Sequence, residues 1–423
     1  MVAFRKESLT LEGCVKPERL LLAALQLTTL HFGIALANPP ASLRTAYAYD
    51  TLFSSYYQNS SERPERVVWI NDRLKGAGLL DSLVPVVPID SPMIWIKKVH
   101  TQTHIDGIRA IAVDIGNGAT RSVGEIADLA VAYALGSVKI VMEGHADNAF
   151  ANIRPPGHHV VNGGYLAGFC AYANAVIAAT YAREVFGISK ILIVDWDYHY
   201  GNSTETFFCQ DTNIFFAEFG SYASEPSSCN SSARRMITYN IGNGYNEDYL
   251  RVFTDSISSA MQIFRPELII ISCGFDLKDF DGLGSYHVTA AGISSFTKSL
   301  MDIAANHCSG KIVSLLEGGY HDSGSNPTTW YGLSQCAENH VRTLMTCSLQ
   351  AETEFFKSAS LCHFRSDKSE TKPRSCDLEG NEIYNIQGKC LGICASSKNA
   401  ALKSIQVGIY KNGSRYAIRP VGK

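Results

Sequence analysis

Asp195, Asp197 and His199 alternate directly after a short apolar run, residues 191–194, near the middle of the chain. Four aliphatic residues are too few for a helix and are typical of a strand buried on both faces. Alternate residues of an extended segment share one side, so Asp197 and His199 could bind one metal ion. Oxygen and nitrogen ligands without a thiolate favour zinc or Fe(II) at a catalytic site. The alternative is a strand end whose acids cap the next helix.

Polar residues with catalytic chemistry also follow other segments. His158 and His159 are adjacent and end a loop stiffened by proline and glycine, where a packing role for both imidazoles is hard to justify. Two further aliphatic segments precede Asp276 and Tyr320. Because open α/β sheets carry their chemistry where parallel strands end, these side chains are candidates for one active site.

The segments that must position these residues alternate between strand-like and helix-like patterns. The expected strands are residues 44–50, 191–194, 213–217, 268–276 and 311–316. The expected helices are residues 62–74, 104–112, 124–142, 170–187, 248–264, 288–306 and 330–349. This alternation predicts an α/β fold with a mostly parallel central sheet and helices on both faces.

In this order, the motifs resemble those of the zinc-dependent histone deacetylases and acetylpolyamine amidohydrolases over about residues 44–345. The resemblance implies a three-layer arginase/deacetylase-like fold, and we expect the catalytic domain at residues 44–349. It makes Asp197, His199 and Asp276 the expected ligands of a catalytic Zn²⁺. Three protein ligands leave positions for water and for the substrate carbonyl.

The resemblance also gives roles to the residues around the metal. His158 and His159 match a tandem acid–base pair, with Asp195 as the expected partner of the first and Asn202 of the second. Asn202 stands where some members carry aspartate, which resembles the class II deacetylases. An amide supplies no negative charge, so it would leave His159 less basic than a carboxylate would. Tyr320 matches a tyrosine that donates a hydrogen bond to the oxyanion.

A narrow channel for the acyl-lysine side chain is implied as well. Its expected residues are Gly168, Phe169, Leu283, Gly318 and Gly319. Leu283 stands where the relatives that prefer polyamines carry glutamate, which favours an acyl-lysine substrate here. The rim residue that would hold the substrate backbone stays open: the register places Gly118 there, with Asp114 nearby. Tyr222 is a candidate for a second channel aromatic.

A structural K⁺ ion is the other candidate cofactor. Its expected site comprises Asp195, Asp197, His199, Glu218 and Phe219. Glu218 occupies a serine position of the family. Its carboxylate could coordinate K⁺ or could replace the ion altogether.

Composition narrows the partners. The chain has 423 residues, 46% of them hydrophobic and 18% charged, with a formal net charge of −3. This charge gives no basis for direct nucleic-acid binding through bulk electrostatics. We also expect no transmembrane span.

The first 43 residues form a separate extension. Basic residues precede an apolar stretch, residues 20–37, that ends in Ala35-Leu-Ala37. This pattern predicts a secretory signal, and hence the secretory pathway or the extracellular space. The alternative is an amphipathic helix that packs on the catalytic domain of a cytoplasmic or nuclear protein.

Residues 350–423 differ in composition from the region before them. A polar linker leads into short apolar runs broken by glycine and asparagine, which predicts a small β-rich appendage. It contains Cys362, Cys376, Cys390 and Cys394, which are compatible with two disulfides in an oxidising compartment.

Three functions remain open on the sequence alone. The first is a zinc amidohydrolase that removes acyl groups, above all acetyl, from lysine side chains of proteins such as histones. The second is a deacetylase of acetylpolyamines or another small N-acyl amine. The third is a non-catalytic scaffold that binds acyl-lysine. The oligomeric state stays open.

Overall fold

The computed structural model describes residues 43–56, 61–115, 119–220, 236–239, 241, 244–284, 286–320 and 331–346, and the backbone of 381–384, 390–394, 407–412 and 415–420. The chain divides into two units, Met1–Ala359 and Ser360–Lys423. The predicted signal and the predicted domain boundary near residue 350 lie outside the described residues.

The first unit is built around an eight-stranded sheet with the order β2-β1-β5-β10-β9-β6-β7-β8. Its strands are β1 Thr45–Ala48, β2 Val84–Pro85, β5 Asn148–Ala151, β6 Ile191–Asp195, β7 Ile214–Glu218, β8 Met236–Thr238, β9 Leu268–Cys273 and β10 Ile312–Leu316. Every pairing between neighbours in this sheet is parallel. The predicted α/β class with a mostly parallel sheet is therefore confirmed.

The central strands are largely apolar because helices cover both faces of the sheet; the polar residues in β6, β9 and β10 are Asp195, Ser272 and Ser314. All residues of β6, β9 and β10 are buried. Continuous aliphatic runs are what a doubly covered parallel strand needs, whereas a strand with one wet face would alternate. This is why these three strands could be read directly from the sequence.

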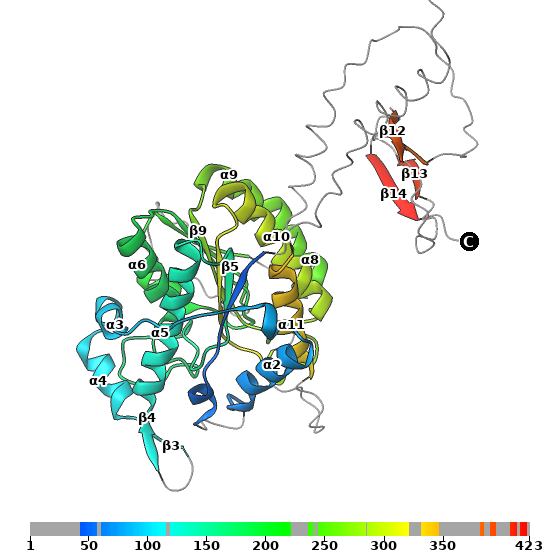
Figure 1. Ribbon diagram of the computed structural model, residues 1–423. Helices are drawn as coiled ribbons and strands as arrows, with labels where there is room; N and C mark the ends of the chain where they lie inside the picture. The colour runs from blue at the N-terminus through cyan, green and yellow to red at the C-terminus, as the bar shows by residue number, and fades with distance from the viewer. Residues whose placement is uncertain are drawn as a thin grey trace, which may run out of the picture. The chain divides into compact units, whose positions relative to one another are not determined.

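Two layers of helices flank the sheet (Figure 1). One layer contains α3 Met93–Val99, α4 Gln102–Ala110, α5 Val123–Met142 and α6 Asn174–Phe186. The other contains α2 Glu65–Gly76, α8 Asn246–Arg251, α9 Ser258–Phe264, α10 Ala290–His307 and α11 Tyr331–Leu344. A short helix, α7 Asn202–Phe208, follows β6. The three-layer arrangement agrees with the expectation.

Some predicted boundaries were wrong. The helix expected at 104–112 ends at Ala110, and residues Ala112–Asp114 form β3, which pairs with β4 Thr120–Ser122 in an antiparallel hairpin. The helix expected at 248–264 contains a π-helical segment, Val252–Ile257, between α8 and α9. The last helix ends at Leu344 and does not continue through the described residues 345 and 346.

The strand β5 was missed, although it lies between β1 and β10. Its sequence is Asn-Ala-Phe-Ala, and alanine and asparagine have low strand propensity. The strand is buried on both sides by its neighbours, so tertiary context determines it. This matters for function because β5 leads into the loop that carries His158 and His159.

In the second unit, two antiparallel hairpins are described. Strand β11 Asn381–Tyr384 pairs with β12 Cys390–Cys394, and β13 Val407–Asn412 pairs with β14 Arg415–Pro420. They agree with the small β-rich appendage expected at the C-terminus.

The described part of the chain includes helices of up to 20 residues. Within it, no helix combines the length and the apolar character that crossing a bilayer requires.

Candidate active site

Five neighbouring strands bring the predicted residues to one edge of the sheet. The strands β5, β10, β9, β6 and β7 are adjacent and parallel, so their carboxyl ends lie together. The loops that follow them carry the histidine pair, Tyr320, Asp276, the Asp197–His199 segment and, at the end of β7, Glu218 itself. This edge is where open α/β sheets bind their ligands.

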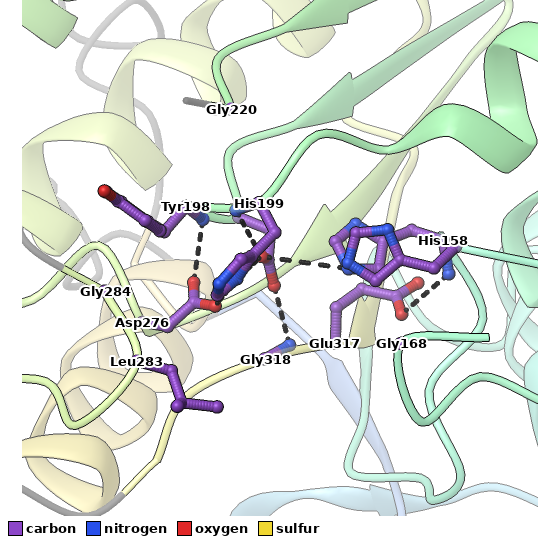
Figure 2. A network of polar contacts seen from close by, with 12 residues as sticks. His158, Gly168, Tyr198, His199, Gly220, Asp276, Leu283, Gly284, Glu317 and Gly318 are labelled. Carbon is purple, nitrogen blue, oxygen red and sulfur yellow. Dashed lines mark hydrogen bonds and ion pairs between the residues drawn. The ribbon is translucent and has the colours of Figure 1, made fainter. Parts of the chain in front are cut away.

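Asp197, His199 and Asp276 form a compact cluster of metal-ligand types. Figure 2 shows His199 and Asp276 next to each other. One ligand atom from each residue lies within 4.8 Å of those of the other two. His199 Nδ1 is 2.8 Å from Asp276 Oδ2 and 3.4 Å from Asp197 Oδ1. Both aspartates are fully buried, whereas His199 is partly exposed. Oxygen and nitrogen donors around a partly open position fit a catalytic metal ion.

The charges of this cluster are strongly coupled. Burial and the charge of Asp197 raise the pKa of Asp276 to about 7. Burial lowers the pKa of His199, but hydrogen bonds to Asp197 and Asp276 more than offset this and raise it to about 10. Burial also acts against the ionised form of Asp197, yet the positive charges of His158 and His199 hold its pKa well below the usual range. A divalent cation would neutralise the two crowded carboxylates.

Backbone N–H groups fix the orientation of both carboxylates. Tyr198 N donates to Asp276 Oδ1 over 2.8 Å, and Gly318 N donates to Asp197 Oδ2 over 2.7 Å. These donors fix the carboxylate oxygens that do not face His199, as the groups around metal ligands commonly do.

Two glycines let the backbone approach the cluster. A Cβ atom on Gly274 would lie 2.0 Å from Asp197 Oδ2. On Gly318 it would lie 2.4 Å from Asp276 Oδ2 and 2.5 Å from Asp197 Oδ2. Any side chain at either position would displace the carboxylates.

The adjacent histidines face different partners. His158 Nδ1 lies 3.0 Å from Asp195 Oδ2, and His159 Nδ1 lies 3.0 Å from Asn202 Oδ1. The amide nitrogen of Asn202 faces the carbonyl of His159 at 3.5 Å, so the amide oxygen faces the ring. The two ring centroids are 4.0 Å apart. The structure thus brings together all four residues that the sequence paired.

The two imidazoles differ in charge as a result. Burial acts against protonation of His158, but Asp197 and Asp195 raise its pKa well above the usual value. Burial and the nearby charge of His158 lower the pKa of His159 to about 3. Neutral His159 can donate from Nδ1 to Asn202 and keep Nε2 free to accept a proton.

Glu317 is a site residue whose contacts were not predicted. Its Oε2 accepts hydrogen bonds from Gly157 N at 2.7 Å and His158 N at 3.2 Å. Burial raises its pKa to about 7. The sequence signal was the carboxylate directly after an aliphatic strand, but nothing in it indicates which backbone groups the side chain would contact.

Tyr320 is held from several sides. Its backbone N donates to Asp281 Oδ2 over 2.8 Å, and its ring lies edge-on to that of Phe169, with centroids 5.9 Å apart. The guanidinium of Arg66 lies 5.0 Å from the ring centroid, and its Nε donates to Gly319 O over 2.6 Å. Gly319 has φ +115°, a conformation that favours glycine. Sequence reasoning missed Arg66.

Arg66 belongs to a buried ion cluster that was also missed. The carboxylate of Glu62 accepts two hydrogen bonds from Arg154, each 2.6 Å long, and one from Arg66 at 3.0 Å. All three residues are fully buried, and the Glu62 carboxylate offsets part of the positive charge of the two arginines. Because Arg154 begins the loop before His158, the cluster ties that loop to α2. The i, i+4 spacing of Glu62 and Arg66 was the only sequence signal.

The expected channel residues lie around this cluster. Gly168 and Phe169 form the tip of a turn with φ values of +50° and +70°, and a Cβ on Gly168 would lie 2.3 Å from the His159 ring. The side chain of Leu283 is partly exposed, and its N donates to Asp281 Oδ1 over 2.9 Å. In the view of Figure 2, Leu283 and Gly168 lie on opposite sides of Gly318.

Glu218 lies beside Asp195 in the expected K⁺ site. Its Oε2 accepts from Gly201 N at 3.0 Å and its Oε1 from Gly220 N at 2.5 Å. Burial and the charge of Asp195 raise its pKa well above the usual value. A cation would relieve this repulsion, and so would a proton on Glu218. Binding of K⁺ at this site, with Phe219 as one of its residues, therefore stays a prediction.

The comparisons with known proteins agree with this geometry. A family model described as the histone deacetylase domain matches residues 60–336. A probable deacetylase of Archaeoglobus fulgidus is 30% identical over 289 residues, which cover 64% of this chain and 79% of that protein. Histone deacetylase 15 of Arabidopsis thaliana is 31% identical over 291 residues, 62% of this chain and 50% of that protein.

A solved structure is similar as well. The crystal structure of the HDA15 HD domain has a TM-score of 0.62 and 26% identity, and the match covers 76% of this chain and 98% of that one. The chain spans only about half the length of the plant relative. The region that matches the family model contains the candidate active-site residues at the strand ends, from His158 to Tyr320. This region is a deacetylase domain, a hydrolase, and the chain belongs to the histone deacetylase family.

Proposed function

We propose that the chain is a zinc-dependent amidohydrolase that removes acetyl groups from lysine side chains of proteins such as histones. The observation that supports this most is the meeting of Asp197, His199 and Asp276 with the pair His158 and His159 at one edge of the sheet. Two carboxylates and one imidazole suit zinc, and they leave positions for water and a carbonyl oxygen.

Zinc, when bound, supplies a Lewis acid that polarises the acetyl carbonyl and lowers the pKa of water. His159 accepts the proton of the attacking water at Nε2, because its Nδ1 faces Asn202. His158, whose protonated form Asp195 stabilises, donates a proton to the leaving amine. The opposite charge states of the two rings divide the acid and base roles between them.

Tyr320 completes the proposed site. Its hydroxyl would donate a hydrogen bond to the oxygen that gains negative charge. The contacts of its ring with Phe169 and Arg66, and of its backbone with Asp281, fix the side chain before substrate arrives. Such preorganisation stabilises charge in the transition state without rearrangement.

The substrate class can be tested directly. The purified chain, loaded with zinc, is expected to hydrolyse an acetyl-lysine peptide with a higher kcat/KM than acetylated spermidine. Leu283 favours this order, because a leucine offers a polyamine cation no countercharge. Preference for the acetylated polyamine would support the alternative substrate class. Binding of acetyl-lysine peptide without hydrolysis would support the scaffold.

We also propose that the N-terminal extension directs secretion. Expressed in cells with a secretory pathway, the mature chain is expected to begin at Asn38, directly after Ala35-Leu-Ala37. Mass spectrometry of the N-terminal peptide from medium and lysate measures this. Leu22→Arg, which places a charge in the apolar stretch, should retain the chain in the cell. An unprocessed cytosolic chain that begins at Met1 would contradict the proposal and favour the cytoplasmic or nuclear alternative.

A further inference from the structure

Two buried histidines outside the candidate active site contact the same loop. His100 directly follows α3, and His104 lies in the first turn of α4. They are 4% and 0% exposed, and their ring centroids are 4.7 Å apart. Both ring nitrogens of each histidine bond to residues 162–173, the segment between His159 and α6.

The contacts of His100 define its tautomer. Its Nε2 lies 3.0 Å from Ala173 N, which can only donate, so Nε2 must be the unprotonated acceptor. Nδ1 then carries the proton and donates to Asn162 Oδ1 over 2.7 Å. This imidazole therefore bridges the two ends of the segment.

His104 makes the same kind of bridge with the opposite tautomer. Its Nδ1 accepts from Gly164 N at 3.1 Å, so Nε2 carries the proton and donates to Ala171 O over 2.8 Å. Each ring therefore needs one protonated and one unprotonated nitrogen, so both imidazoles must be neutral. Burial favours that state, since it lowers the pKa of both rings.

The helix α4 also packs directly on the segment. A Cβ atom on Gly107 would lie 2.3 Å from Gly164 O and 2.5 Å from Gly164 Cα. There is thus no room for a side chain between α4 and the segment. The two histidines and this glycine contact fix the outer side of the segment.

The inner side of the same segment faces the catalytic residues. Between the bridged ends, Ala167 and Cys170 pair through backbone hydrogen bonds of 2.8 and 3.2 Å and form a tight turn. At its tip, the backbone of Gly168 packs on the ring of His159, and Phe169 packs on Tyr320. Loosening of the ends would therefore move the turn relative to the catalytic side chains.

We propose that His100 and His104 are positioning residues that hold the channel-wall loop, residues 162–173, against the catalytic side chains and thereby set the fit of the acyl group. This deepens the proposed function, because the loop provides one wall of the channel. The histidines act through Gly168 and Phe169 and do not touch the substrate.

The test compares acyl groups of different length. For His100→Ala and His104→Ala, KM for an acetyl-lysine peptide should rise about fivefold or more, as the loss of a neutral hydrogen-bond bridge implies. The ratio of kcat/KM for acetyl- over butyryl-lysine peptide should fall, because a loosened wall accepts a longer chain. His100→Gln, whose amide oxygen can replace the Nε2 acceptor, should restore most of the parental KM.

A matched control separates positioning from simple destabilisation. Asn148 donates a buried hydrogen bond to Leu344 O over 2.9 Å at the opposite end of β5, far from the site along the strand. Asn148→Ala should lower the thermal midpoint, while KM and the acyl-length ratio stay parental. If the histidine variants lower the midpoint and leave both kinetic readouts unchanged, the proposal is overturned.

A measurement that does not depend on catalytic turnover tests this inference separately from the proposed function. Amide hydrogen exchange at Gly168, Phe169 and Cys170 should accelerate in His104→Ala, whether or not the parent is active on these peptides. Gly107→Ala, which keeps both imidazoles but pushes on Gly164, should accelerate it as well. Parental exchange in all variants would contradict the proposal, and a parent inactive on every peptide would contradict only the proposed function.

Discussion

Replacing His159 with alanine should lower kcat by about 10²–10⁴-fold, the range for the loss of a general base. His159 is the ring whose Nδ1 faces a neutral amide, Asn202, so it stays unprotonated and its Nε2 can accept a proton. Burial and the charge of His158 lower its pKa, which favours the same state. His158→Ala should cost less, because an electrostatic and acid partner can be replaced in part by solvent.

The pH profiles of the two variants test this assignment. A base must be neutral, so its activity is lost as the pH falls through its pKa, and His159→Ala should remove the acidic limb of kcat/KM. The pKa of His158 is raised, so it stays protonated below that value and its contribution is lost as the pH rises. His158→Ala should therefore alter the basic limb. Equal losses in both variants would contradict this division of roles, and a larger loss in His158→Ala would reverse it.

Tyr320→Phe should lower kcat by about 10²–10³-fold, the cost of removing one oxyanion donor. The variant should fold and bind zinc like the parent, because the contacts of the ring and backbone do not involve the hydroxyl. Circular dichroism measures folding, metal analysis measures zinc content, and steady-state kinetics on an acetyl-lysine peptide measures kcat.

A second tyrosine provides the control. Tyr165 is 55% exposed and lies on the same loop as Phe169, so Tyr165→Phe removes a hydroxyl without touching the metal cluster. Its kcat should stay within about twofold of the parent, as expected for a surface change. If Tyr320→Phe turns over peptide like Tyr165→Phe, the tyrosine has another function.

The metal cluster could be predicted because each ligand follows a strand that is readable from its own sequence. Asp197 and His199 come after β6, and Asp276 comes after β9. Both strands begin with four aliphatic residues. Parallel pairing brings the ends of these strands to one edge of the sheet, and the family resemblance added Asp276 to the two ligands read from the β6 segment. The ordered motifs supplied the rest of the predicted set.

The buried residues that hold the site in place could not be predicted, because they form contacts between distant parts of the chain. The pair Arg154 and Glu62 is 92 residues apart, and Arg66 is 253 residues from Gly319. No local pattern shows that these charges meet in the core. The same holds for β5, whose Asn-Ala-Phe-Ala sequence forms a strand only because two neighbours pair with it.

The hairpin of β3 and β4 shows a different limit. Its first strand, Ala112–Asp114, was assigned to the end of a helix, since the apolar spacing of α4 continues up to it. Asp114 ends this strand and is exposed, whereas Gly118, the other candidate for the channel rim, and Tyr222, the candidate for the second channel aromatic, lie outside the described residues. The rim residue therefore stays open.

Metal analysis tests the central claim most directly. The parent purified from zinc-supplemented medium should contain a single zinc ion per chain. Asp276→Ala should lose most of it, whereas Asp279→Ala, which removes an exposed carboxylate from the same loop, should retain it. Both variants must show parental circular dichroism for the comparison to hold. Full zinc retention in Asp276→Ala would contradict the assignment of the metal site.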